Sequence, residues 1–296
     1  MSDRWRLLRL QNNELELVIL PGIGGRLWDV VFHGQSLLFQ NPDLNGIAFD
    51  DTDLADLPTR APQYGFPLWG GEKTWIAPDT LWHKGSPFPA LDSGPYQVTS
   101  QSDLHVEVIS TICPISQLSV TRRITLTSST TWRIAHTVTN HGAGSRTAGI
   151  WSVMMIDTPA TIGVAMDKPE VSPVFGVAGS QVMPTPTGVV AQCAVPQEFK
   201  VGLPCPDGQT FITFGKTGPL LTCTTPPPMP EDNFAHGHPV EVFNSGDYPY
   251  CEAEWHSPAR DLKPGQHLQF RQDFELWPND APPSSTRHKD LLSCMF

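Results

Sequence analysis

The chain has little positive charge. Its 296 residues include 19 lysines and arginines against 30 acidic residues, so the formal net charge is -11. Charged residues of both signs together make up only 17% of the sequence. Nucleic acids and anionic membrane surfaces bind to basic patches, and this charge balance argues against both as partners.

Long apolar runs are also absent. No segment approaches the 18 consecutive apolar residues that a membrane-spanning helix needs, and the first residues, MSDRWRLLRLQNNELEL, lack the apolar stretch of a signal peptide. The six cysteines show no CxxC spacing. We therefore expect reduced thiols, no membrane span and a cytoplasmic location.

The motifs of the common cofactor and nucleophile sites are missing. The stretch PGIGGRLWDVVFHG contains GxGG, but the residues after it alternate like a strand, whereas a dinucleotide site requires a helix there. There is no GxSxG motif. His236 and His238 are spaced to share a metal ion, but no third ligand stands at a recognisable distance. The sequence predicts no cofactor and no bound metal.

The sequence does have many prolines and a strong alternation of apolar and polar residues. The 30 prolines are about twice the usual ~5% and leave little room for long helices. In HLQFRQDFELW, residues 267–277, apolar and polar side chains alternate as in a half-buried strand. Similar strands are expected at 14–20, 26–32, 104–112, 117–127, 131–139, 146–157, 209–214, 219–224, 239–244 and 250–256. The predicted class is all-β.

A dozen or more strands exceed the roughly seven strands of one immunoglobulin-sized sandwich. Two sandwiches or one large antiparallel β-sandwich would both fit, and the lack of a linker favours a single domain over residues 1–278. Residues 279–296 are expected to form a flexible tail whose last apolar residues dock. Segments 41–95 and 157–187 are predicted to be long irregular loops, a feature typical of functional sites. We expect a monomer or a weak homodimer.

One stretch inside the first segment, FPLWGGEKTWIAPDTLWHKG at residues 66–85, is rich in tryptophan. Exposed tryptophan faces suit the flat apolar side of a pyranose ring, and charged groups beside them can hydrogen-bond its hydroxyls. The alternative is that the tryptophans are core residues. A glycine pair that lets backbone approach a ligand favours a binding loop. The candidate residues are Trp69, Trp75, Trp82, Glu72 and Lys73, with Gly70 and Gly71 as the pair.

A second candidate is the strand at residues 250–256. Alternation places Glu252, Glu254 and His256 on one face, and Cys251, Ala253 and Trp255 on the other. Neighbouring carboxylates raise each other's pKa, so the first face could form an acid/base cluster. A solvated strand face is the competing explanation.

Three segments in the correct order resemble galactose mutarotase-like proteins. They are LVILPGIGGRLWDVVFHGQSLLFQNP, WRIAHTVTNHG and YCEAEWHSPARDLKPGQHLQFRQDFELW, and WGGEKTWIAP is similar to a branch with a GGdKtWpAP motif. The resemblance implies a large antiparallel supersandwich with a carbohydrate site on its concave face. It also implies aldose 1-epimerase chemistry, in which a base and an acid open the sugar ring and the ring closes on either face.

On this resemblance Glu254 matches the catalytic base, with Glu252 as the second choice, and Arg26 matches an arginine that holds the sugar. The family's histidines have no counterpart at the matching positions. YGFPL replaces an HGFaR motif, so Tyr64 stands where a histidine would fall. The local substitutes for the acid are His83, Lys73 and Tyr64, and the middle region adds Trp151 and Asp157 as sugar contacts.

Three hypotheses follow. The first is an aldose 1-epimerase-like enzyme acting on an aldose or a sugar phosphate. The second is a non-catalytic domain that binds or senses a sugar in the same cleft. The third is a structural β-sandwich without a ligand, in which the tryptophans are core.

Overall fold

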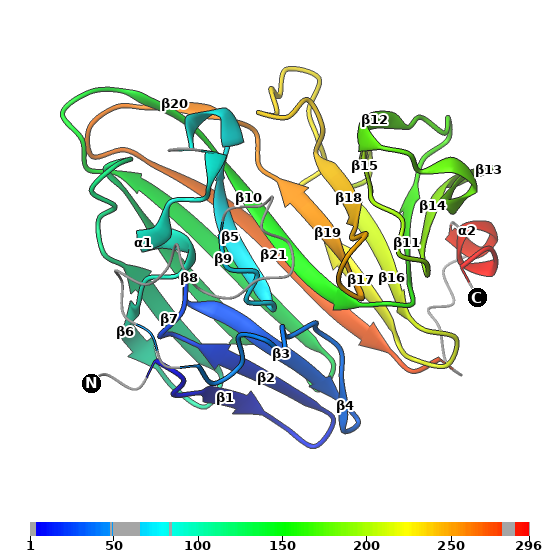
Figure 1. The fold of residues 1–296 in the computed structure, drawn as a ribbon, viewed down its shortest axis with the longest axis horizontal. Helices are drawn as coiled ribbons and strands as arrows, with labels where there is room; N and C mark the ends of the chain where they lie inside the picture. The colour runs from blue at the N-terminus through cyan, green and yellow to red at the C-terminus, as the bar shows by residue number, and fades with distance from the viewer. Residues whose placement is uncertain (1–3, 48, 50–65, 83–84, 280–287, 296) are drawn as a thin grey trace.

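The computed structural model describes residues 4–47, 49, 66–82, 85–279 and 288–295. In this part of the chain the strands form two large antiparallel sheets that pack face to face (Figure 1). The prediction of an all-β, large antiparallel sandwich is confirmed. The α-helices described are short: α1 (Pro89–Asp92) has 4 residues and α2 (Lys289–Ser293) has 5.

We call the two sheets sheet 1 and sheet 2. Sheet 1 contains strands from the first and the last parts of the chain, and so does the sandwich as a whole. Across sheet 1 the path is β1 (Leu8–Gln11), β2 (Leu15–Leu20), β3 (Arg26–Phe32), β5 (Glu72–Ala77), β10 (Arg146–Asp157), β19 (Tyr250–His256), β18 (Val240–Asn244), β15 (Phe199–Leu203) and β12 (Ser172–Gly176), with β4 (Gln35–Ser36) and β20 (Arg260–Leu262) beside it. Across sheet 2 the path is β13 (Val182–Thr185), β14 (Gly188–Cys193), β11 (Ala160–Ala165), β16 (Gln209–Phe214), β17 (Leu220–Thr224), β21 (His267–Trp277), β9 (Thr131–Asn140), β8 (Leu118–Leu126), β7 (His105–Ser110) and β6 (Tyr96–Gln101).

The part of sheet 2 formed by β7, β8, β9 and β21 follows the predicted alternation closely. In β9 every second side chain is buried, including Trp132, Ile134 and Val138, and the residues between them are partly exposed. This pattern arises because one face of the sheet packs against sheet 1 and the other faces solvent. His136 lies on the buried face and is fully inaccessible, as expected of a core histidine.

Sheet 1 is buried on both faces in its centre. All six residues of β5 and all seven of β19 are buried. On one side their neighbours are the side chains of sheet 2, which form the main core. On the other side they meet aromatic side chains and the loops that carry them. This second face is where the candidate site lies.

Two predicted loops contain strands. The tryptophan-rich stretch was expected to be a loop, but Glu72–Ala77 forms β5, which pairs with β10 in the middle of sheet 1. Segment 157–187 was expected to be irregular, yet it supplies β11, β12 and β13. Both predictions were wrong because strands buried on two faces, or as short as β13, show no clear alternation.

The end of the chain packs against sheet 2 (Figure 1). Leu291, Leu292 and Met295 are buried against residues of β14 and β16, among them Val190 and Phe211. The last apolar residues of segment 279–296 therefore dock as expected. None of the helices in the described ranges has the length and apolar character needed to cross a membrane.

Candidate functional site

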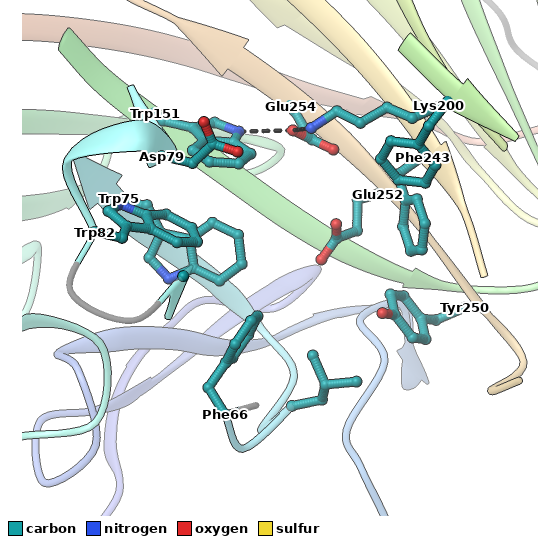
Figure 2. A pocket seen from close by; sticks show the side chains of 13 residues that line it. Phe66, Trp75, Asp79, Trp82, Trp151, Lys200, Phe243, Tyr250, Glu252 and Glu254 are labelled. Carbon is teal, nitrogen blue, oxygen red and sulfur yellow. Dashed lines mark hydrogen bonds and ion pairs between the residues drawn. The ribbon is translucent and has the colours of Figure 1, made fainter. Parts of the chain in front are cut away.

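A cavity of about 220 Å³ lies on the face of sheet 1 that is turned away from sheet 2. Its floor is formed by β5, β10, β15, β18 and β19, which are neighbours in the sheet. Figure 2 shows tryptophan rings on one side, Tyr250 and Phe243 on the other, and Glu252 between them. The cavity thus combines aromatic walls with a charged floor, the composition of many small-molecule sites.

Strand alternation decides which side chains reach this cavity. In β19, Glu252 and Glu254 line it, whereas Cys251, Ala253 and Trp255 belong to the core between the sheets. The predicted assignment of the two faces of this strand is confirmed. The acidic face is not solvated, because Glu254 is fully buried and Glu252 is 7% exposed.

Three tryptophans form one wall. The rings of Trp82 and Trp151 are stacked, with centroids 5.5 Å apart, and Trp75 meets Trp151 edge-on at 4.9 Å. Trp75 and Trp151 are buried, and Trp82 is half-buried. Trp82 also donates its N–H to the backbone oxygen of Ile76 at 2.9 Å, which fixes its ring. The wall is rigid and presents apolar surface to the cavity.

Glu254 is the most constrained carboxylate of the floor. Its Oε2 accepts hydrogen bonds from Trp151 Nε1 at 2.6 Å and from Lys200 Nζ at 2.8 Å (Figure 2). Its Oε1 is buried without a hydrogen-bond partner in the described part of the chain. Burial raises the pKa of Glu254 to about 8, with Glu241 and Glu252 adding to the rise and Lys200 opposing it. A carboxyl group with this pKa can take up and release a proton near neutral pH.

Lys200 links Glu254 to a second buried carboxylate. Its ammonium lies 2.8 Å from Oε2 of both Glu254 and Glu241, and 4.5 Å from the centre of the Trp151 ring. Burial alone would lower the pKa of Lys200, but the two carboxylates outweigh it and raise the pKa. Lys200 is therefore a fixed positive charge at the back of the cavity.

Behind Trp151, Glu241 is surrounded by donors. Nδ1 of His236 and Nε2 of His256 each lie 3.2 Å from its Oε2. Burial would raise the pKa of Glu241, but these hydrogen bonds and the charge of Lys200 hold it well below its usual value. Burial lowers the pKa of His256 to about 4, so this imidazole is neutral. His238 does not join this group and lies against Gly202 instead.

Glu252 has its own lysine partner. Lys73 Nζ donates to Glu252 Oε1 at 3.0 Å and lies 4.4 Å from the centre of the Trp75 ring. Burial lowers the pKa of Lys73 despite the attraction of Glu252. Lys73 thus touches the cavity only through Glu252 and Trp75, which both line it.

Arg26 and Trp69 lie outside the cavity lining. The Arg26 guanidinium donates to Asp92 Oδ1 at 2.7 Å, and the same oxygen accepts the Trp75 indole N–H at 2.7 Å. Arg26 therefore reaches the cavity only through the Asp92–Trp75 contact. Trp69 is fully buried in a separate cluster and donates its N–H to Ser93 Oγ at 2.9 Å.

The glycine pair serves packing. A Cβ on Gly70 would lie 2.3 Å from the backbone oxygen of Phe39, and one on Gly71 would lie 2.6 Å from that of Leu27. Both residues also have positive φ angles, at which other residues are strained. The close approach that was expected toward a ligand is therefore made to neighbouring backbone.

Two further candidates lie away from the cavity, and two cannot be placed. Glu72 points between the sheets, where it pairs with Arg122 and accepts a hydrogen bond from Ser152 Oγ at 3.0 Å. Asp157 is exposed at the end of β10. Tyr64 and His83 fall outside the residues that the structure describes.

Sequence reasoning missed Lys200 and Glu241. Each is the one charged residue in a largely apolar strand, FKVGL for Lys200 and VEVFN for Glu241. That pattern was a usable signal, since a charge inside an apolar strand must find a buried partner. Asp79, Phe243 and Tyr250 also line the cavity. Alternation could have placed Tyr250 on the face of Glu252 and Glu254, and Phe243 on the face of Glu241.

Sequence comparison identifies no relative: no protein-family model matches the chain, and no curated protein does. Solved structures do match. A protein from Escherichia coli K12, provisionally assigned as an aldose 1-epimerase, is 14% identical with a TM-score of 0.59, over 92% of this chain and 99% of that one. A galactose mutarotase related enzyme from Lactobacillus acidophilus is 10% identical with a TM-score of 0.58, over 92% and 97%.

A galactose mutarotase-like protein from Clostridium acetobutylicum gives the same result, at 12% identity and a TM-score of 0.56, over 92% of this chain and 95% of that one. At such low identity the match establishes the arrangement of the strands and not the chemistry. The three segments that resembled this group in the sequence lie in both sheets of the sandwich. The chain has the galactose mutarotase-like fold.

Proposed function

We propose that this protein binds a monosaccharide in the cavity on sheet 1. The observation that carries the proposal is the arrangement of the Trp75, Trp82 and Trp151 wall opposite the buried charges of Glu252, Glu254 and Lys200. A pyranose ring has apolar C–H faces and a polar rim, so it can lie on an indole while its hydroxyls bond to the charged groups.

The structural-sandwich hypothesis predicts inaccessible tryptophans and no cleft near Glu254. Trp69 fits that description, since it is fully buried away from the cavity. Trp82 does not, because it is half-buried and lines a cavity that also contains Glu254. The tryptophan-rich stretch therefore has a structural part around Trp69 and, in our proposal, a sugar-binding part at Trp75 and Trp82.

The proposal extends to interconversion of sugar anomers, the activity named for several structural neighbours. Glu254 would remove the proton from the anomeric hydroxyl, the bond between C1 and the ring oxygen would break, and an acid would protonate that oxygen. The resulting open-chain aldehyde would close on either face. The free Oε1 of Glu254 supports its role as base. The candidate acids are His83 and, acting through its hydrogen bond to Glu252, Lys73.

A non-catalytic sugar-binding domain is the second candidate. It is favoured by one observation: among the residues that the structure describes, no histidine lines the cavity. A domain of this kind would keep the tryptophan wall and the hydrogen bonds to the hydroxyls, and would lack the second proton-transfer group. In either case the partner is a small sugar.

NMR on the purified protein with a panel of aldoses and hexose phosphates tests both candidates. Saturation transfer reports binding, and exchange between the anomer signals reports catalysis. We expect binding with accelerated exchange, and Glu254→Gln should abolish the exchange. Binding without exchange would support the non-catalytic domain. Neither binding nor exchange with any sugar would refute the proposal.

A matched control is Glu275→Gln, which changes a carboxylate on β21 in sheet 2. It should leave binding and exchange unchanged, because it lies on the other sheet. If Glu275→Gln and Glu254→Gln had equal effects on exchange, Glu254 would have no specific role as base.

A further inference from the structure

The cluster of His236, Glu241 and His256 lies behind Trp151 and outside the sugar cavity lining. One ligand atom from each of the three residues lies within 4.8 Å of the others. We propose that these residues form a binding site for a divalent metal ion that accepts nitrogen and oxygen ligands, such as Zn²⁺. The proposal does not depend on the sugar site.

The distances fit such an ion. Nδ1 of His236 and Nε2 of His256 are each 3.2 Å from Glu241 Oε2. Ligands at about 2.0–2.2 Å from a tetrahedral zinc ion are separated from one another by about 3.3–3.6 Å. Two of the three ligand separations are already close to this size, so the main change needed is that the two imidazoles move closer together.

Neighbouring elements hold the three side chains in place. Glu241 in β18 lies directly opposite Glu254 in β19, and the backbone N–H of His256 donates to Pro239 O at 2.9 Å. The His256 ring is stacked on Trp151 at 5.4 Å, and the His236 ring meets Trp151 edge-on at 4.6 Å. The site is therefore built on two paired strands and one indole ring, which limits the rearrangement that an ion would require.

Hydrogen bonds within the cluster leave polar atoms unsatisfied. Glu241 Oε1, His256 Nδ1 and His236 Nε2 are buried with no hydrogen-bond partner in the described residues. Glu241 and His256 are at most 2% exposed. Three donors meanwhile crowd Glu241 Oε2, from Lys200, His236 and His256. An ion bound by His236 Nδ1, His256 Nε2 and the Glu241 carboxylate would replace the two imidazole hydrogen bonds to Oε2 and could give Oε1 a partner.

The surroundings supply an outer partner and a competing charge. Asp79 Oδ1 lies 3.7 Å from Nε2 of His236, the position in which carboxylates commonly orient a metal-bound imidazole. Lys200 opposes a cation, but its ammonium also contacts Glu254 and can stay with Oε2 of the two glutamates. Glu241 keeps its negative charge beside this lysine, and Asp79 adds a second carboxylate next to His236.

The test is a titration of chelator-treated full-length protein with Co²⁺, followed by visible absorption, and with Zn²⁺, followed by calorimetry. We expect one ion per chain. His236→Gln should weaken the affinity at least about tenfold, since loss of even an outer-shell partner has effects of this size. His236 belongs to a loop, so this variant should stay folded, which circular dichroism can check.

His238→Gln is the matched control, since it removes a histidine from the same loop that has no part in the cluster. It should leave the affinity unchanged. Zn²⁺ should also raise the melting temperature of the wild type and of His238→Gln but not that of His236→Gln. No binding to the wild type, or equal affinity in both variants, would overturn the proposal and leave a hydrogen-bonded cluster only.

Discussion

Two buried charge networks stand back to back on the same strands. On the inner side of sheet 1, Glu72 in β5 pairs with Arg122 from sheet 2 and accepts a hydrogen bond from the Ser152 hydroxyl. On the outer side, Lys200 bridges Glu254 and Glu241 at 2.8 Å each. Glu72 and Lys73 are consecutive residues of β5 and thus lie on opposite faces of the sheet, Glu72 against Arg122 and Lys73 against Glu252.

The difference between the two networks lies in what covers them. Both oxygens of Glu72 have protein partners, Arg122 and Ser152, and the network is closed between the sheets. In the outer network Glu254 Oε1 has no partner among the described residues, and the carboxyl group lines a cavity. A network whose polar atoms are all paired can only stabilise the folded state. A network with an unpaired oxygen beside a cavity can also form a hydrogen bond to a ligand.

The largest effect on folding is expected from breaking the inner network. Glu72→Ala would leave the Arg122 guanidinium buried without its carboxylate, which should cost about 3–5 kcal/mol of unfolding free energy. Urea denaturation measures the loss. The control is Asp273→Ala, which breaks the half-exposed Arg133–Asp273 pair and should cost about 0–1 kcal/mol. Equal losses would show that burial does not separate the two kinds of pair.

A second comparison concerns tryptophans on the two sides. Trp132 is fully buried between the sheets and stacked on Phe274 with centroids 4.9 Å apart, so Trp132→Ala should cost about 3–5 kcal/mol of stability. Trp82→Ala, in the half-buried cavity wall, should cost less than half of that stability. It should weaken sugar binding about tenfold, because about one aromatic contact with the sugar would be lost. Denaturation and NMR titration measure the two effects. Unimpaired sugar binding by Trp82→Ala would contradict our placement of the ligand.

The stability of the protein is also expected to depend on pH through His136, which lies between the two sheets. Burial and then the charge of Arg122 lower the pKa of His136 to about 3, against the hydrogen bond that Gln272 Oε1 accepts from its Nε2. Thr74 Oγ1 contacts the other ring nitrogen. The unfolded chain therefore takes up a proton below about pH 6.5 that the folded protein does not. Stability from this group is complete above that pH and is lost as the pH falls, by up to about 1.4 kcal/mol per pH unit.

Denaturation at pH 7.5, 6 and 5 tests this. His136→Gln should reduce the loss of stability between pH 6.5 and 5, while His267→Gln, at an exposed position, should not. A wild-type stability that stays constant over this range, or the same slope in His136→Gln, would show that His136 can be protonated in the folded state.

The smallest effect on folding is expected from Glu254→Gln in the outer network. The amide oxygen can still accept the Trp151 N–H, and the pocket leaves room on the other side, so stability should change by about 1 kcal/mol or less. Anomer exchange should nevertheless fall at least about a hundredfold, the size of a general-base contribution. A stability loss as large as that of Glu72→Ala would show that Glu254, like Glu72, serves mainly to stabilise the fold.

The sequence by itself determined the fold class and the division of β19 into two faces. Period-two alternation indicated the strands of sheet 2, because their outer face is in contact with solvent and must be polar. The same argument placed Glu252 and Glu254 on one face. It could not identify β5 as a central strand, because both faces of β5 are buried and its residues look alike in their burial.

Only the tertiary structure decided which charges and aromatic rings share the cavity. Trp69 and Trp82 stand in one short stretch, yet one belongs to a closed cluster and the other to the cavity wall. Lys200 is distant in sequence from both Trp151 and Glu241, and strand pairing in sheet 1 brings its ammonium to both of them. Contacts of this kind depend on which strands become neighbours and on which face is left open, and a single sequence read in local windows contains neither.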